Sequence, residues 1–280
     1  MLRLIWFALV MSLIPYSRQS ISEEDIVAIN KVMRSDFLTQ GPKIDEFENE
    51  LSSWFGVEHA ITCSSGTAAL HLAYAAVGVN EESLGIVPAI TFSATANALR
   101  YQSAQVMFCD VQAETGLIDL GSLQHCLEQV DEKQKEKTNL IAPVSFAGCV
   151  APLKECKTLA DRYGFSLVED ASHSPGAWKT DASGSRIKSS SGEWADASTL
   201  SFHPVKHLCC GEGGAVLTNS SSLAGLAKRL RTHGIRRPFE ESHDTPWRYE
   251  QEDLGWNYRL TDLQAALGIS QLRRLDEFLT

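Results

Sequence analysis

Short apolar runs alternate with helical patterns over residues 59–170, and this alternation restricts the fold more than any other feature of the chain. Apolar runs predict strands at residues 60–63, 84–91, 105–111, 140–146 and 165–168. Helical spacing between them predicts helices at residues 68–77, 93–101, 120–130 and 153–163. Strands that alternate with helices form a mostly parallel sheet, sandwiched by helices on both faces. Ligands of such α/β folds bind at the carboxyl ends of the strands.

Segments outside this region are less regular. Helical spacing predicts helices at residues 22–33, 43–55 and 221–233, and a long amphipathic helix at residues 262–278. Residues 180–192 are rich in Ser and Gly and predict a loop.

Charge and cysteine usage exclude several classes of protein. The formal net charge of -10 argues against sequence-independent nucleic-acid binding, which needs a surplus of Lys and Arg to neutralise phosphates. The seven cysteines have no paired CxxC spacing, and Cys209 and Cys210 are adjacent. We interpret them as reduced thiols of a cytoplasmic protein and expect no metal centre.

Residues 1–13 form an apolar leader with a single Arg3. The run is too short to span a bilayer, and no small-residue cleavage site follows it. An export signal, a membrane-surface anchor and a misplaced start codon are the alternatives. We favour the last and expect no membrane partner.

A lysine stands between two strand-like runs in residues 197–218. The runs at 197–202 and 215–218 flank a loop that contains Pro204, Lys206 and three glycines. Desolvation in such a loop lowers the pKa of a lysine, so that its neutral amine can attack a carbonyl. The alternative is a solvated lysine between two strands.

Three further features complete a candidate site. Gly66, Thr67 and Ala68 lie between a predicted strand and helix, where backbone amides form either a phosphate cradle or a plain helix cap. Asp170 ends a predicted strand and could pair with a cationic ring nitrogen, bind a metal or cap a turn. Phe92 follows a predicted strand and could stack on a flat cofactor or belong to the core. Together with a lysine, these parts match the needs of pyridoxal phosphate (PLP).

Six segments carry a resemblance to a known family: IPYSRQSI, SSGTAALHLA, VPAITFSATANA, VEDASHSPGA, SFHPVKHLCCGEGGAV and GWNYRLTDLQAALG. In this order they resemble the sugar-nucleotide aminotransferases of the DegT/DnrJ/EryC1/StrS family, which have the PLP-dependent transferase fold type I. The resemblance extends from residue 14 to the end of the chain.

The resemblance implies roles for the lysine and its neighbours. Lys206 would be the Schiff-base lysine and would later move the proton between substrate and cofactor. Asp170 would pair with the pyridine nitrogen, and Phe92 would stack on the ring. His173 would lie near the phenolic oxygen, although a structural role is the alternative for this histidine.

The resemblance also implies the remaining contacts and the substrates. Gly66, Thr67, the Ala68 backbone and Ser201 would hold the cofactor phosphate. Asn257 would reach the phosphate bound by the partner subunit, which implies a homodimer. The amino donor would be glutamate. The acceptor would be a UDP-linked 4-keto-6-deoxy sugar, used in surface-glycan or pseudaminic acid biosynthesis.

Two departures from the family affect the expected domains. Family members continue for about a hundred residues beyond this end, the size of one small domain. We therefore expect a leader of doubtful origin at 1–13, a PLP-binding large domain at 14–250 and the start of a truncated C-terminal small domain at 251–280. The helix after Thr261 would then lack packing partners. Family members carry no such leader.

Three other functions compete with sugar amine transfer. The dehydratase branch of the family has histidine at the lysine position, and Lys206 argues against it. A non-catalytic fragment of the family is the second alternative. A Rossmann oxidoreductase is disfavoured, because GEGGAV precedes a strand and the chain lacks GxGxxG before a helix.

Overall fold

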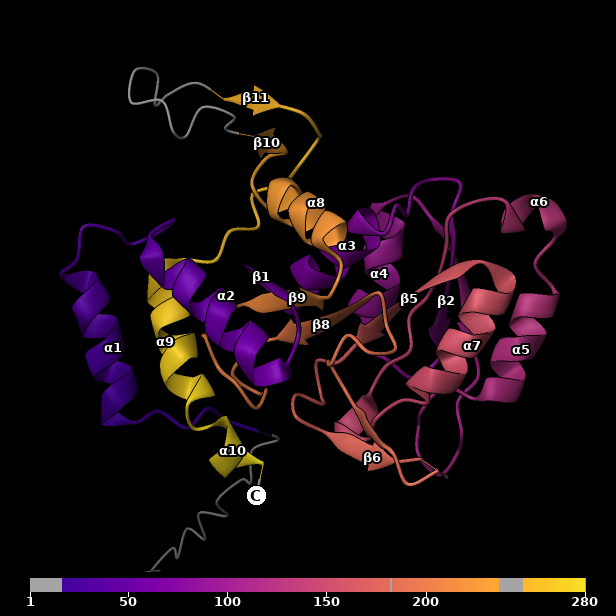
Figure 1. The fold of residues 1–280 in the computed structure, drawn as a ribbon, viewed down its shortest axis with the longest axis horizontal. Coiled ribbons are helices and arrows are strands. Elements are labelled where there is room, and N and C mark those ends of the chain that lie inside the picture. The colour runs from indigo at the N-terminus through magenta and orange to yellow at the C-terminus, as the bar shows by residue number, and fades with distance from the viewer. Residues whose placement is uncertain (1–16, 182, 237–248, 280) are drawn as a thin grey trace, which may run out of the picture.

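A mostly parallel seven-stranded sheet forms the centre of the structure (Figure 1). The computed structural model describes residues 17–181, 183–236 and 249–279. The sheet strands are β1 (His59–Cys63), β2 (Leu84–Pro88), β3 (Gln105–Cys109), β4 (Asn139–Ile141), β5 (Phe165–Asp170), β8 (Ala197–Ser201) and β9 (Gly214–Thr218). Their order is β1-β9-β8-β5-β4-β2-β3. Strands β3, β2, β4, β5 and β8 pair in parallel, whereas β9 is antiparallel to both β8 and β1.

Helices cover both faces of this sheet, which confirms the predicted α/β sandwich. One face packs against α3 (Gly66–Ala76), α4 (Ser93–Tyr101) and α8 (Ser221–Arg231). The other face packs against α5 (Leu120–Glu128) and α7 (Leu153–Tyr163) at the β3 end of the sheet. At the β1 end it packs against α2 (Pro42–Phe55) and α9 (Asp262–Leu272). Figure 1 shows α1 (Glu23–Met33) outside α2 and α9, away from the sheet.

The remaining elements are short. They are α6 (Glu132–Lys135), a 3-10 turn at Phe146–Gly148, α10 (Leu275–Phe278), and the two-stranded sheets β6 (Trp178–Thr180) with β7 (Arg186–Lys188) and β10 (Ile235–Arg236) with β11 (Glu250–Gln251).

Several predicted boundaries are wrong for local reasons. The strand predicted at 140–146 ends at Ile141, because Pro143 has no N–H to give to a ladder. The loop predicted at 180–192 contains β7 and the last residue of β6, which together form an antiparallel hairpin. The helix predicted at 262–278 is interrupted at Arg273 and Arg274, between α9 and α10.

The prediction that the helix after Thr261 lacks packing partners is also wrong. Helix α9 packs against α1 and α2, and most of its side chains are buried. Its first residue, Asp262, accepts hydrogen bonds from the backbone N–H groups of Gly41 (2.8 Å) and Lys43 (3.0 Å). Gly41 is the N-cap of α2 and has no side chain to cap the helix, so Asp262 supplies the missing acceptor. The leader predicted at residues 1–13 lies outside the described residues.

The described residues contain no helix that is both long and apolar enough to cross a bilayer. All seven cysteines are free, as predicted.

Candidate active site

The predicted site residues gather at one edge of the sheet because of the way β9 is inserted. Gly214, the first residue of β9, pairs with Cys63 at the end of β1 and with Ser201 at the end of β8. The turn after β1 and the loop after β8 are therefore neighbours. The second of these loops carries Lys206, and the end of β5 next to β8 carries Asp170.

The N-terminus of α3 forms a narrow cradle. The helix begins at Gly66, two residues before the predicted start, so that Gly66 and Thr67 belong to its first turn. Ser65 caps the helix, and its hydroxyl accepts from the Ala68 N–H at 3.1 Å. The predicted phosphate donor at Ala68 is thus engaged within the described structure. The N–H groups of Gly66 and Thr67, which the geometry of a first turn leaves without a helical partner, point out of the helix end.

Two glycines allow this cradle to close against β8 and β9. A Cβ atom at Gly66 would lie 2.8 Å from Cβ of Ser201. A Cβ atom at Gly214 would lie 2.4 Å from the carbonyl oxygen of Ser65. Only glycine fits at either position without a backbone shift. The structure therefore brings Gly66, Thr67 and Ser201 together. A side chain at position 66 or 214 would occupy the space between the start of α3 and these two strands.

Asp170 is buried and held by hydroxyl and amide donors. Its side chain accepts from Thr95 Oγ1 at 2.8 Å on Oδ2, and from Ser172 N–H (3.2 Å) and Ser172 Oγ (2.7 Å) on Oδ1. The residue is 4% exposed and forms no ion pair with any described side chain. A buried carboxylate without a cation is costly, so this position suits a positively charged ring nitrogen.

Lys206 is half-buried and lies within electrostatic reach of Asp170. Desolvation lowers the pKa of Lys206, and the charge of Asp170 opposes that shift. Burial also lowers the pKa of His173, with a further decrease from Lys206 and an opposing increase from Asp170. His207 follows Lys206 and has its pKa lowered by burial and then by the lysine. The structure therefore groups the carboxylate of Asp170 with one amine and two imidazoles, and the lowered pKa of Lys206, His173 and His207 favours the neutral form of each of these three bases.

Phe92 and Asn257 are more exposed than the other predicted residues. Phe92 is 71% exposed at the N-cap of α4, after the end of β2. Asn257 is exposed and forms an isolated backbone bridge with Thr232. Their roles, in stacking and in reaching a partner subunit, stay predictions.

The donors that hold Asp170 were missed in the sequence. Thr95 lies within VPAITFSATANA and Ser172 within VEDASHSPGA, so both stood inside motifs that indicated the family. A threonine in the first turn of a helix is usually interpreted as part of a cap, and its contact is with a residue 75 positions away. A hydroxyl two residues after a strand-end acid was the one local signal, because Asp side chains commonly form turns of this kind.

Glu169 occupies the opposite face of β5 and takes no part in this site. It is fully buried and accepts from the hydroxyls of Ser145, Ser189 and Ser198 and from the Ser190 N–H, at 2.6 to 2.9 Å. Alternation along the strand thus assigns one acid to the site and the other to the packing of the β6–β7 segment.

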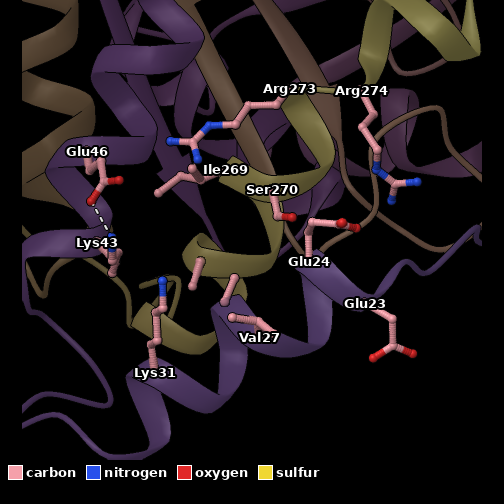
Figure 2. A pocket seen from close by; sticks show the side chains of 12 residues that line it. Glu23, Glu24, Val27, Lys31, Lys43, Glu46, Ile269, Ser270, Arg273 and Arg274 are labelled. Carbon is pink, nitrogen blue, oxygen red and sulfur yellow. Dashed lines mark hydrogen bonds and ion pairs between the residues drawn. The ribbon is translucent and has the colours of Figure 1, made fainter.

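A separate groove of about 450 Å³ lies between α1, α2 and α9 (Figure 2). Figure 2 shows that both acidic and basic side chains surround it, including Glu24, Lys31 and Arg273. None of the predicted site residues lines this groove. Within the described residues, no three His, Cys, Asp or Glu side chains come together in a way that could hold a metal ion.

The mostly parallel sheet, with a half-buried lysine, a buried acid and a helix N-terminus at one edge, defines the class of fold type I transferases. Comparison with known proteins narrows this class. The chain belongs to the DegT/DnrJ/EryC1/StrS aminotransferase family, whose family model matches residues 19–280.

Individual relatives agree with this assignment. The UDP-4-amino-4,6-dideoxy-N-acetyl-beta-L-altrosamine transaminase of Campylobacter jejuni is 40% identical over 264 residues, which cover 94% of this chain and 65% of that protein. The chain thus spans less than two-thirds of the length of this curated relative. The structure of Helicobacter pylori PseC, an aminotransferase of pseudaminic acid biosynthesis, matches with a TM-score of 0.80 at 30% identity, over 94% of this chain and 66% of that one. The PLP-form of Streptococcus pneumoniae Spr1654 matches with a TM-score of 0.79 at 27% identity, over 94% and 67%.

Proposed function

We propose that the protein is a PLP-dependent aminotransferase that transfers an amino group from glutamate to a UDP-linked 4-keto-6-deoxy sugar. The observation that carries this proposal is the half-buried Lys206, whose pKa is lowered by desolvation beside the buried Asp170. Family membership and the names of the similar proteins support the nucleotide-sugar substrate and a role in pseudaminic acid or surface-glycan biosynthesis.

The described residues fit the cofactor. Lys206 would hold it covalently through Nζ, and Asp170 would pair with its ring nitrogen. Gly66, Thr67 and Ser201 would hold its phosphate at the N-terminus of α3, where the helix dipole and free N–H groups favour an anion. Ala68 could join them only if its N–H left the hydroxyl of Ser65. His173 would face the phenolic oxygen, and Phe92 would cover one face of the ring.

PLP, when bound, supplies a ring that accepts electrons from the substrate carbon. The chain supplies the proton transfers and the charge balance. Once the incoming amine has released its Nζ, Lys206 in its neutral form would carry the proton between the substrate carbon and the cofactor carbon that bears the transferred amino group. Asp170, whose carboxyl oxygens accept hydrogen bonds from Thr95 and Ser172, would stabilise positive charge on the ring nitrogen.

We further propose a cytoplasmic homodimer in which the exposed Asn257 reaches the phosphate held by the other copy. The proposed domain division places the cofactor domain at residues 14–250 and the start of a small domain at 251–280. The seven free cysteines support the location.

Two measurements test the proposal. Borohydride reduction of the PLP-loaded protein should fix the cofactor on Lys206, as read by peptide mass spectrometry, and Lys206→Ala should give no label. Incubation with PLP, glutamate and a panel of UDP- and dTDP-linked keto sugars should give an aminated UDP-sugar by mass. A label on another lysine would refute the site, and labelling without any aminated product would refute the transfer activity.

A further inference from the structure

Thr95 is a buried threonine that donates a hydrogen bond to the acid of the proposed site. The residue is fully buried in the first turn of α4, and its hydroxyl lies 2.8 Å from Asp170 Oδ2. A second hydroxyl, Thr91 Oγ1, lies 2.7 Å from Thr95 Oγ1. Both threonines flank Phe92, the predicted stacking residue.

The direction of this chain of hydroxyls follows from counting protons. A hydroxyl has one proton to donate, and an ionised carboxylate can only accept. Thr95 therefore donates to Asp170, and Thr91 must donate to Thr95. The proton order is Thr91 to Thr95 to Asp170, and each bond polarises the next one.

The two oxygens of Asp170 then differ in what they have left to offer. Oδ1 already accepts two donors, the N–H and the hydroxyl of Ser172, which fill its two lone pairs. Oδ2 accepts from Thr95 alone and keeps one lone pair free.

We propose that Thr95 is a positioning residue for Asp170, and that it holds Oδ2 so that the free lone pair of this oxygen meets the cofactor's ring nitrogen. The inference rests on the proposed function. It assigns the ring-nitrogen contact to one oxygen and makes its strength depend on a hydroxyl that touches neither cofactor nor substrate.

Backbone hydrogen bonds fix Thr95 at the start of α4. The Thr95 N–H donates to the Phe92 carbonyl at 3.1 Å, and the Thr95 carbonyl accepts from Tyr74 Oη at 3.2 Å. Burial, with a smaller contribution from the charge of Asp170, raises the pKa of Tyr74 well above its usual range, so this phenol remains a donor. Tyr74 is thus a matched control, because it bonds to Thr95 but not to the carboxylate.

The test uses PLP labelled with 15N at the ring nitrogen and bound to the full chain. The 15N chemical shift reports protonation of the ring nitrogen and does not depend on turnover. Thr95→Val removes the hydroxyl at constant shape. It should move the shift toward the unprotonated value and weaken PLP binding by about tenfold, the effect of one hydrogen bond to a charged group. Thr95→Ser keeps the hydroxyl and should restore both readouts. Tyr74→Phe should leave the 15N shift at the wild-type value.

Asp170→Asn separates the failure of this inference from the failure of the proposed function. If Asp170→Asn moves the 15N shift but Thr95→Val does not, the inference is refuted and the role of the acid stands. If neither variant moves the shift, both are refuted. If Thr95 had only a structural role, Thr95→Val and Tyr74→Phe should change the 15N shift and PLP binding equally. This result would also overturn the inference. Thr95→Ala serves in place of Thr95→Val if the valine variant does not fold.

Discussion

The cradle at the start of α3 makes a quantitative prediction for Gly66→Ala. The added Cβ would lie 2.8 Å from Cβ of Ser201, whereas carbon atoms in ordinary contact are about 3.5 to 4.0 Å apart. The first turn of α3 must therefore move by about 1 Å away from β8. Overpacking of this kind costs about 1 to 3 kcal/mol of the free energy of unfolding.

The same shift should weaken cofactor binding. Moving the N–H groups of Gly66 and Thr67 by about 1 Å loses at least one hydrogen bond to a phosphate, which corresponds to about a tenfold or larger rise in the Kd for PLP. Urea unfolding of the cofactor-free protein gives the stability, and fluorescence titration with PLP gives the Kd.

Gly225→Ala is the matched control. Gly225 lies in α8 and is exposed, with no atom within 4 Å of an added Cβ. This variant should raise the free energy of unfolding by about 1 kcal/mol, because alanine is the better helix former, and should leave the Kd for PLP unchanged.

A double-mutant cycle tests the origin of the effect. Ser201→Gly removes the two nearest atoms that an alanine at position 66 would meet and leaves the Cα of residue 201 at 3.3 Å, so the double variant should be more stable than the two single effects predict, by about 1 kcal/mol or more. The reasoning fails if Gly66→Ala resembles Gly225→Ala in both measurements, or if the two changes at the cradle are additive.

Three further predictions concern titrating groups. The rate at which PLP attaches to the cofactor-free protein should rise with pH, with a midpoint below the 10.5 of an ordinary lysine, because desolvation lowers the pKa of Lys206; Asp170→Asn should move this midpoint lower still, and an upward shift would contradict the assignment. Asp170→Ala should reduce amine transfer by about a thousandfold, a barrier increase of about 4 kcal/mol measured from kcat, whereas a twofold loss would mean that the acid does not serve the ring. Burial lowers the pKa of His71 from 6.5 to about 4, so the unfolded chain binds a proton that the folded chain refuses between these values. The free energy of unfolding should therefore fall by up to about 3 kcal/mol as pH drops from 6.5 to 4, and urea melts of His71→Phe should lack this component.

The sequence was sufficient for elements whose signal is local. The helix at 93–101 and the strand that leads into Asp170 follow from neighbouring residues, and the structure has both. Pairing across the sheet was harder to predict. The run at 215–218 follows 197–202 without a helix between them, which indicates an antiparallel return, but its insertion beside β1 depends on contacts with a strand far away in the chain.

The candidate site likewise contains residues that a local sequence pattern could identify and residues that depend on contacts with distant parts of the chain. Lys206 was identified from its place in a loop between two strand-like runs and Asp170 from its place at the end of a strand, and their roles stay predictions. Thr95 could not be assigned, because its partner lies on another element. The choice between Glu169 and Asp170 follows from which face of β5 each one occupies, and strand alternation alone does not say which face carries the site.

The reversed strand β9 has a consequence for how the molecule folds. Neither the cradle after β1 nor the lysine loop after β8 can reach its final place until β9 has paired with its neighbour β8 and with β1, which lies far away in the sequence. Closing so long a loop is slow compared with forming local helices. Recovery of PLP binding during refolding should therefore lag behind recovery of the helical circular dichroism signal. The rate at which PLP binding recovers would then report the pairing of β9 with β1.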